Sequence, residues 1–346
     1  MTFRLGILGG GNISSTHAHA AAQIRGAEVV AVWGHNARKA VALGNEIGAR
    51  AYEHLEDFLH QPMDAVLIGS PPGMHAEHAC AAAERGLHVL VEKPLEISTG
   101  RVDEIIEVCD RAHVKLGVFL QDRTAPEVAW LKRLVESGGI GRPLLFSARV
   151  KWYREPSYYS GSRWRGTRDL EGGGALMNQG IHTLDLLQWL LGDAERVYAR
   201  TRTAFHDIEV EDTVVACLDF AGGVAGTFEA TTAAYPGYPR RIELTGTEGT
   251  VILENDCIIS VDLRSDPVEP IPSEAPDDSP RSNTPLISDL RGHRRIIEDF
   301  MRAIATDSAP LCDGREARRS VALAEAVYQS GLTGLPIVFD REAVLT

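Results

Sequence analysis

The sequence predicts an α/β protein of two domains, in which a parallel sheet is followed by a larger, mainly antiparallel sheet. Three observations lead to this prediction. Short apolar segments alternate with helical segments over the first third of the chain, whereas strands separated by tight turns dominate the middle. The chain of 346 residues is long for a single domain, and its hydrophobic content of 44% is ordinary for a globular protein.

The chain opens with an apolar strand that runs into three glycines and then a helix, over Phe3–Ser14. A helix N-terminus offers unpaired N–H groups and a partial positive charge, and glycine lets the backbone approach an anion. Gly9 and Gly11 match the first two glycines of the dinucleotide fingerprint, and Ser14 stands at the position of the third. The alternative is a glycine-rich turn of another α/β protein, but the flanking strand and helix favour a dinucleotide site.

Strands and helices continue to alternate after this turn. The strands are short and apolar, which is typical of a parallel sheet covered on both faces. Ligands bind such sheets beyond the carboxyl ends of the strands, where the polar and glycine-rich loops of this part of the chain lie. We expect strands over Glu28–Trp33, Ala65–Ile68, Leu87–Val91 and Lys115–Phe119, and helices over Ala37–Ile47, His75–Arg85 and Val102–Ala112.

The remainder of the chain changes character. Several predicted strands meet at tight turns such as Ala221-Gly222-Gly223, which indicates an antiparallel sheet. The segment Ser265–Pro285 is rich in proline, serine and acidic residues and predicts a long surface loop. We expect strands over Leu144–Tyr153, Arg196–Ala204, Thr213–Phe220, Val224–Thr232, Arg240–Leu244, Thr250–Leu253 and Ile337–Phe339, and helices over Ala125–Ser137, Ile287–Ala305 and Arg315–Gly331.

The composition argues against several classes of function. A formal net charge of −13 argues against a general nucleic-acid or anionic-membrane partner. The five cysteines are scattered without a C-x-x-C pair, so we expect a reducing compartment and neither a disulfide framework nor a cysteine zinc site. No signal peptide precedes the first strand and no apolar run could cross a membrane, so we expect a cytoplasmic protein. His17, His19, His75 and His78 lack acids at ligand spacing, so we expect no metal site.

One apolar segment, which begins at Gly172 and ends at Gly192, is expected to form a single buried helix. Asn178, His182, Asp185 and Trp189 recur in it at i, i+4, i+7 and i+11, and so form one line along the helix. Buried polar groups are costly unless they are paired or line a cavity. We interpret this line as a site, the alternative being a satisfied polar stripe.

Two further residues bear on the site. Gly180 lies inside the predicted helix, where glycine costs about 1 kcal/mol relative to alanine, so it indicates close approach of a ligand or another backbone. Lys93, in Glu92-Lys93-Pro94, follows a predicted strand at the sheet edge where ligands bind. Taken alone, Lys93 is better explained as a solvent-facing lysine at a strand end.

The glycine turn, Glu92-Lys93-Pro94 and the segment around His182 together resemble the glucose-fructose oxidoreductase / inositol dehydrogenase / MocA (Gfo/Idh/MocA) family. The resemblance covers essentially the whole chain and includes Trp164-Arg165 and the closing stretch Asp313–Ser330. It implies an N-terminal Rossmann NAD(P)-binding domain and a C-terminal α/β domain with a large open, mainly antiparallel sheet, which binds substrate and forms homodimer or homotetramer contacts. We place these domains at residues 1–122 and 123–346.

The resemblance also implies the chemistry, which is hydride transfer between NAD(P) and a carbinol carbon of a sugar, a sugar acid, a nucleotide-sugar or a cyclitol. Lys93 would orient and polarise the reacting oxygen, and His182 would act as the general acid/base. Histidine suits this role because it titrates near neutral pH, and a nearby ammonium stabilises alkoxide character. Asn178 stands where many members carry aspartate; an amide cannot act as a base, so we interpret it as a substrate hydrogen-bonder.

The cofactor contacts that the resemblance implies lie in the loops at the sheet edge. No acid follows the second strand to accept the ribose 2′-OH of NAD. His35, Asn36, Arg38 and Lys39 lie there instead, and Asn36, Arg38 and Lys39 could hold a 2′-phosphate, so the sequence favours NADP. The alternative is that the basic residues belong to a solvated first helical turn. The other expected contacts are Gly9, Gly11, Asn12 and Ile13 at the pyrophosphate, Ser70, Pro71 and His75 along the ribose–nicotinamide path, and Glu92, Lys93, Gln121, Trp164 and Arg165 around the nicotinamide.

Aromatic residues and arginines are concentrated between Lys151 and Arg165. Aromatic faces suit sugar rings and arginines suit carboxylates or phosphates, so Tyr153 and Arg163 are expected to contact the substrate with Asn178 and His182. The alternative is a packed crossover loop. Two other functions stay open: an enzyme that retains its NAD and cleaves glycosidic bonds, and a nucleotide-binding regulator without catalysis.

Overall fold

The chain forms two compact units in the computed structural model, which describes residues 2–267, 269–272 and 289–339. Of these, residues 2–121 and 289–318 make up the first unit, and the others make up the second. The segment 289–318 thus differs from the sequence prediction, which placed everything after residue 122 in the second domain. It returns to the first unit because its helix packs against the first helix and the fifth strand of the chain. The predicted loop over Ser265–Pro285 lies mostly outside the described residues, as does the predicted helix start at Ile287.

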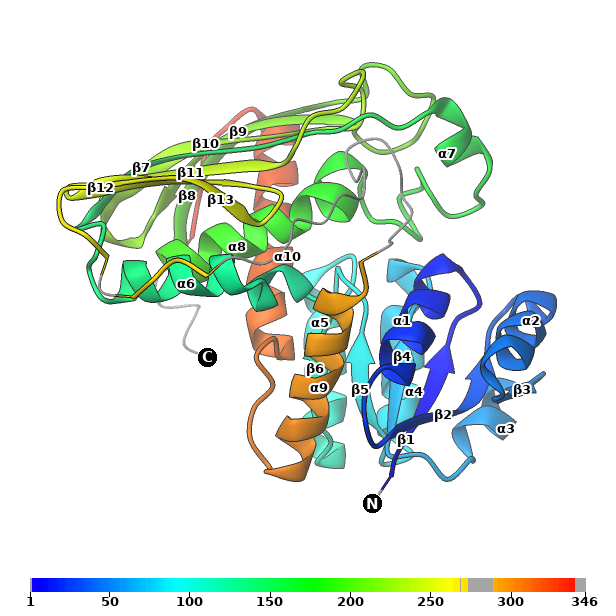
Figure 1. Cartoon of the computed structure of the whole chain (residues 1–346). Coiled ribbons are helices and arrows are strands. Elements are labelled where there is room, and N and C mark those ends of the chain that lie inside the picture. The colour runs from blue at the N-terminus through cyan, green and yellow to red at the C-terminus, as the bar shows by residue number, and fades with distance from the viewer. Residues whose placement is uncertain (1, 268, 273–288, 340–346) are drawn as a thin grey trace. The chain divides into compact units, whose positions relative to one another are not determined.

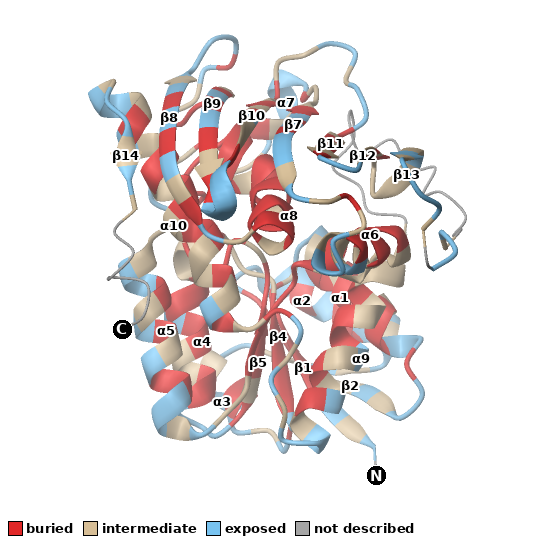
Figure 2. Cartoon of the chain, turned by 90° about the vertical axis from the view of Figure 1, so that its left-hand side faces the viewer, coloured by how far each residue is buried: buried red, intermediate tan, exposed pale blue. Residues whose placement is uncertain are grey.

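A six-stranded parallel sheet forms the centre of the first unit, in the order β3-β2-β1-β4-β5-β6 (Figure 1). This order is that of the Rossmann dinucleotide-binding fold, with its switch point between β1 and β4. The central strands are buried throughout most of their length (Figure 2), which explains their apolar sequences. The strands are β1 (Phe3–Leu8), β2 (Ala27–Trp33), β3 (Arg50–Tyr52), β4 (Ala65–Ile68), β5 (His88–Val91) and β6 (Leu116–Val118).

Helices flank this sheet, with α1 packed against α9 and α4 packed against α5. The sequence missed β3 and α3, since elements of three and five residues are too short to show a periodic pattern. The helices are α1 (Asn12–Ala22), α2 (Ala37–Ile47), α3 (Leu55–Leu59), the 3₁₀ helix η1 (Pro72–Met74), α4 (His75–Ala83), α5 (Thr99–Ala112) and α9 (Arg291–Ala305).

The second unit contains an eight-stranded sheet in the order β13-β12-β11-β7-β10-β9-β8-β14. Only β7 and β10 pair in parallel, so the sheet is mainly antiparallel, as predicted. Helices lie along one of its faces (Figure 1), whereas the other face exposes apolar side chains such as Leu145 and Val215. The strands are β7 (Pro143–Lys151), β8 (Ala194–Arg202), β9 (Thr213–Phe220), β10 (Val224–Thr231), β11 (Arg241–Gly246), β12 (Gly249–Glu254), β13 (Cys257–Leu263) and β14 (Ile337–Val338).

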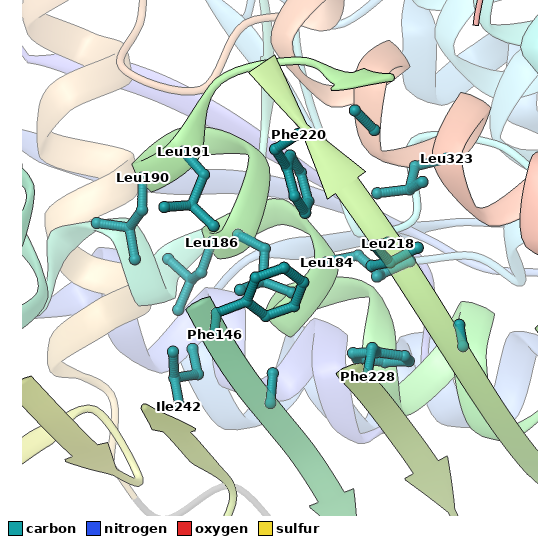
Figure 3. Close-up of a cluster of buried hydrophobic side chains, with 14 of the residues drawn as sticks. Phe146, Leu184, Leu186, Leu190, Leu191, Leu218, Phe220, Phe228, Ile242 and Leu323 are labelled. Carbon is teal, nitrogen blue, oxygen red and sulfur yellow. The ribbon is translucent and has the colours of Figure 1, made fainter. Parts of the chain in front are cut away.

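The core of the second unit lies between this sheet and helix α8, which is buried along almost its whole length (Figure 2). Leu184 from α8, Phe146 and Phe228 from the sheet and Leu323 from α10 belong to this core (Figure 3). No helix in the described part of the chain is long and apolar enough to span a membrane. The helices are the 3₁₀ helix η2 (Gln121–Thr124), α6 (Pro126–Glu136), α7 (Pro156–Ser160), the π-helix η3 (Ala175–Gly180), α8 (Ile181–Leu191), the 3₁₀ helix η4 (Ala221–Gly223) and α10 (Gly314–Thr333).

The predicted single helix from Gly172 is wrong in its first part. Residues 172–174 are irregular, and the π-helix η3 then leads into α8. Gly174 has a φ of −104° and a ψ of −104°, which are not helical, and a side chain there would collide with the backbone of Glu211. Gly180 has a packing reason, because a Cβ there would lie 3.0 Å from Cζ of Phe228. The close contact that the sequence predicted at Gly180 is therefore made by the sheet, through Phe228.

Asp185 has a structural role, contrary to its expected place in a functional line. Its carboxylate accepts hydrogen bonds from Nε and Nη2 of Arg123, at 2.7 and 2.6 Å, and from Oγ of Ser320, at 2.9 Å. The side chains of the ion pair are each only 2% exposed. The guanidinium also lies over the ring of Trp189, 5.5 Å from its centroid. This network joins α8 to η2 and α10.

We expect Asp185→Ala to lower the free energy of unfolding by about 3–5 kcal/mol, because it removes the carboxylate that pairs with a buried guanidinium. Urea denaturation followed by circular dichroism measures the change. Asp219→Ala removes the partner of the more exposed Arg196 and should cost less than about 1 kcal/mol. Equal losses in the two variants would contradict the assigned role of Asp185.

Candidate active site

The predicted phosphate cradle lies at the carboxyl end of β1. Gly9 has a φ of 136°, and a Cβ there would lie 2.8 Å from the carbonyl oxygen of Gly69, so only glycine fits. Gly11 is the N-cap of α1, makes no side-chain capping bond, and has no atom within 4 Å of where its Cβ would lie. The open backbone at a helix N-terminus without acidic residues in its first turn fits a dinucleotide pyrophosphate.

The first turn of α1 completes the cradle. Asn12 is exposed and Ile13 half-buried, while Ser14 is fully buried between the backbones of Gly9 and Gly69. Ser14 therefore fills the place of the third fingerprint glycine, where helix and strand pack closely.

His35 and Asn36 lie in the turn after β2, whereas Arg38 and Lys39 lie in the first turn of α2, and all four are exposed. The Asn36 side chain accepts a hydrogen bond from the backbone N–H of Lys39 at 3.2 Å and so caps α2. The side-chain oxygen of Asn36 thus caps the helix. The basic side chains of Arg38 and Lys39 remain as the candidates for binding a 2′-phosphate.

His75 lies fully buried between two loops at the sheet edge. Its Nε2 is 2.9 Å from the carbonyl oxygen of Ser70, and its Nδ1 is 3.0 Å from that of Pro94. Both ring nitrogens thus contact backbone, and His75 joins the loop Ser70-Pro71 to the loop that carries Lys93. Burial lowers its pKa and so favours the neutral ring.

Glu92 forms a buried cluster with two histidines from distant parts of the sequence. Its Oε1 lies 2.8 Å from Nε2 of His17 and 3.7 Å from Nε2 of His293, while Oε2 accepts a hydrogen bond from the backbone N–H of Lys93 at 3.1 Å. Burial raises the pKa of Glu92, but hydrogen bonds and charge from both histidines outweigh it and hold the pKa well below its usual range. His17 therefore does have an acidic companion, and the ionised Glu92 fixes the backbone at Lys93. Gln121, another expected cofactor contact, lies at the start of η2, where the N-terminal segment of the first unit ends.

In the second unit, Asn178 and Gln179 lie on the π-helix η3. Nδ2 of Asn178 donates a short hydrogen bond to Oε1 of Glu171, whose Oε2 accepts another from the backbone N–H of Gly166. Glu171 is only 1% exposed. Burial raises its pKa to about 7, although the hydrogen bonds from Gly166 and Asn178 and the charge of Arg165 lower it. Sequence analysis missed Glu171, because three glycines separate it from the helix and it belongs to no motif.

His182 lies in the first turn of α8, and its Nδ1 is 3.5 Å from Oδ2 of Asp122. Asp122 also pairs with Arg240, which in turn pairs with Asp256. A carboxylate beside Nδ1 favours the tautomer with the proton on that nitrogen, which makes Nε2 the proton acceptor. Sequence analysis missed Asp122 because it lies 60 residues from His182 without a motif.

The segment of aromatic residues and arginines is partly packed. The guanidinium of Arg165 lies over the rings of Tyr158 and Trp164, 4.2 and 5.1 Å from their centroids. Tyr153 is half-buried and meets the ring of Tyr235 edge-on at 5.2 Å, whereas Arg163 is exposed. Packing thus accounts for part of this segment, whereas substrate contacts by Tyr153 and Arg163 stay a prediction.

These features are typical of nicotinamide-dependent oxidoreductases. They are a Rossmann sheet with an open phosphate cradle, a lysine at a strand end, and a second unit whose helix carries a histidine. Residues 3–120 match the family described as "Oxidoreductase family, NAD-binding Rossmann fold", and residues 128–252 match "GFO/IDH/MocA C-terminal domain". The chain belongs to the GFO/IDH/MocA family, whose relatives include sugar and cyclitol dehydrogenases, and it is an NAD(P)-dependent oxidoreductase.

Similar proteins include a WlbA dehydrogenase from Bordetella pertussis, solved in complex with NADH and UDP-GlcNAcA. It is 33% identical, the match covers 98% of both chains, and the TM-score is 0.87. D-xylose 1-dehydrogenase (NADP(+)) 2 from Haloferax volcanii is 29% identical over 97% of this chain and 99% of its own. Myo-inositol 2-dehydrogenase from Thermotoga maritima is 29% identical over 73% of this chain and 75% of its own.

Glu171 gives a prediction for the pH dependence of stability. The folded protein keeps its proton up to a pKa of about 7, whereas the unfolded chain releases it near 4.5. The folded state binds more protons between these values, so this carboxyl lowers stability as pH rises through that window. Glu171→Gln should remove a pH-dependent loss of roughly 3 kcal/mol between pH 4.5 and 8, measured by urea denaturation.

Glu209→Gln is the matched control, since Glu209 also accepts a backbone hydrogen bond, from Arg168 at 3.0 Å, but is exposed. Its stability should follow the wild-type pH profile. A wild-type profile in the Glu171→Gln variant would contradict the raised pKa of Glu171.

Proposed function

We propose that the enzyme transfers hydride between NAD(P) and a hydroxyl-bearing carbon of a nucleotide-linked sugar acid. The observation that carries this proposal is the 33% identity, over 98% of both chains, with a dehydrogenase solved with NADH and UDP-GlcNAcA. The exposed Arg163 supports it, because a guanidinium suits the carboxylate and phosphate groups of such a substrate. Tyr153 and the stacked Trp164 and Arg165 offer flat faces beside it.

Lys93 and His182 are the proposed catalytic residues. The Lys93 ammonium would hold the reacting oxygen and stabilise negative charge as the O–H bond breaks. Nε2 of His182 would take the hydroxyl proton in oxidation and return it in reduction, with Asp122 stabilising the imidazolium. The nicotinamide, when bound, exchanges the hydride. Proton and hydride together account for both hydrogens removed from the alcohol.

Two positioning features support this assignment. The backbone of Lys93 is held by Glu92, and the loop beyond it by His75. The helix that carries His182 is locked by the ion pair of Arg123 and Asp185.

A panel of UDP-GlcNAcA, free sugar acids, neutral sugars and inositols, followed by nicotinamide absorbance, tests the function. We expect the highest kcat/KM for the nucleotide-linked acid. Lys93→Met and His182→Asn should each lower kcat by about 10²–10⁴-fold while the protein still binds cofactor. Lys151→Met, which removes an amine paired with Glu229, should leave kcat unchanged.

Higher kcat/KM for neutral sugars would overturn the proposed substrate class. Tight cofactor retention with glycoside cleavage and no net change in absorbance would instead favour the glycosidase-type reaction. Binding of cofactor without activity on any sugar would favour a regulator.

We also propose that the enzyme prefers NADP, since Arg38 and Lys39 lie exposed where an acid would otherwise accept the ribose 2′-OH of NAD. The ratio of kcat/KM for NADP to that for NAD should exceed one, and Arg38→Ala/Lys39→Ala should lower it at least about tenfold by removing the 2′-phosphate contacts. Arg50→Ala, at an exposed arginine of β3, is the control. A wild-type preference for NAD would refute this proposal.

We further propose that the open face of the second unit's sheet forms homodimer or homotetramer contacts. Leu145, Tyr198 and Val215 supply exposed apolar area on its strands.

A further inference from the structure

The hydrogen bond between Asn178 and Glu171 has a defined polarity. Glu171 is buried, and its two oxygens accept from Asn178 Nδ2 and from the backbone N–H of Gly166. Above its pKa of about 7 the carboxylate is ionised and can only accept hydrogen bonds, so the NH₂ end of the amide then faces Glu171. The carbonyl oxygen Oδ1 then lies at the other end of the amide.

The burial of the pair favours one direction of contact. Glu171 is 1% exposed, whereas Asn178 is half-buried and lies one helical turn before His182. A ligand at this point on the helix therefore meets Asn178 and not Glu171. The ligand would contact the carbonyl oxygen Oδ1, because the hydrogen bond to Glu171 keeps the NH₂ group of Asn178 from turning towards the ligand.

The same contact explains why an amide suits this position. An aspartate at 178 would set two carboxylates against each other in a buried place, where like charges are costly. Asparagine supplies an acceptor oxygen of similar reach without the second charge. Its NH₂ group also donates a hydrogen bond to Glu171.

We propose that Glu171 is a positioning residue that fixes the amide of Asn178, so that Oδ1 accepts a hydrogen bond from a donor group of the sugar, a hydroxyl or an amide N–H. This inference rests on the proposed function and on the expected contact of Asn178 with the substrate. It makes the pair a specificity determinant, since a substrate without a donor at that position forgoes this hydrogen bond and binds less well.

Exchanging donor and acceptor across the pair tests the proposal. In Glu171→Gln, the one carbonyl oxygen of the new side chain accepts the hydrogen bond from the backbone N–H of Gly166. Its NH₂ group therefore faces Asn178, and the amide of Asn178 rotates so that Oδ1 accepts from it. Asn178→Asp sets carboxylate against carboxylate. In the double variant, the new carboxylate at position 178 accepts from the new amide at position 171 with one oxygen. It presents its other oxygen to the substrate, as the amide of Asn178 does in the wild type.

With UDP-GlcNAcA as substrate at pH 8, above the pKa of Glu171, we expect each single variant to lower kcat/KM about tenfold or more, mainly through KM, and the double variant to return within about threefold of the wild type. Glu209→Gln should leave both constants unchanged. Analogues that lack one donor group at a time locate the contact: the group whose removal raises KM for the wild type should have little effect in Glu171→Gln.

Urea denaturation of the wild type, the two single variants and the double variant separates the possible failures. A double variant more stable than the two single changes together predict, with no effect of the single variants on KM, would overturn the substrate contact and leave Glu171 a purely structural residue. Additive changes in stability would overturn the assigned hydrogen bond itself. A wild-type enzyme that is inactive on the whole panel would defeat the proposed function and the substrate contact, while the midpoints would still test the orientation of the amide.

Discussion

The buried ion pair between Arg123 and Asp185 is the interaction on which the second unit depends. Two charged side chains removed from water are costly, and only paired hydrogen bonds such as these make their burial tolerable. Because Asp185 lies three residues after His182, the pair fixes both the rotation and the axial position of the helix that carries the proposed base. The leucines around it give α8 its burial (Figure 3), but apolar contacts alone do not select one rotation.

Buried acids have a common role elsewhere in the protein. Glu211 accepts hydrogen bonds from the backbone N–H groups of Gly174 and Leu176 and from the hydroxyl of Tyr328, and so holds the start of the π-helix. Glu92 does the same for the backbone at Lys93. In each case the chain is irregular, its N–H groups have no partner in a helix or sheet, and a carboxylate satisfies them. The acids fix the places where regular secondary structure cannot.

The sequence was sufficient for what depends on periodicity and turn chemistry. The Rossmann sheet, the phosphate cradle and α2, with its bounds at Ala37 and Ile47, follow from apolar runs, glycines and caps. The sequence did not predict what depends on side chains brought together over long distances. Asp122 beside His182 and Glu171 beneath Asn178 carry no local signal, and the apolar pattern of α8 fitted either interpretation of Asp185.

The π-helix that precedes α8 has an evolutionary consequence. A π-turn is an α-helix with one inserted residue, so loss of a single residue from Ala175–Gly180 would restore regular α geometry. The residues before it would then rotate by about 100° about the helix axis while α8, anchored by Asp185, stayed in place. A one-codon deletion would thus exchange the side chain one helical turn before His182, where we propose a substrate contact, without displacing His182. Such a change is a short mutational route to new substrates.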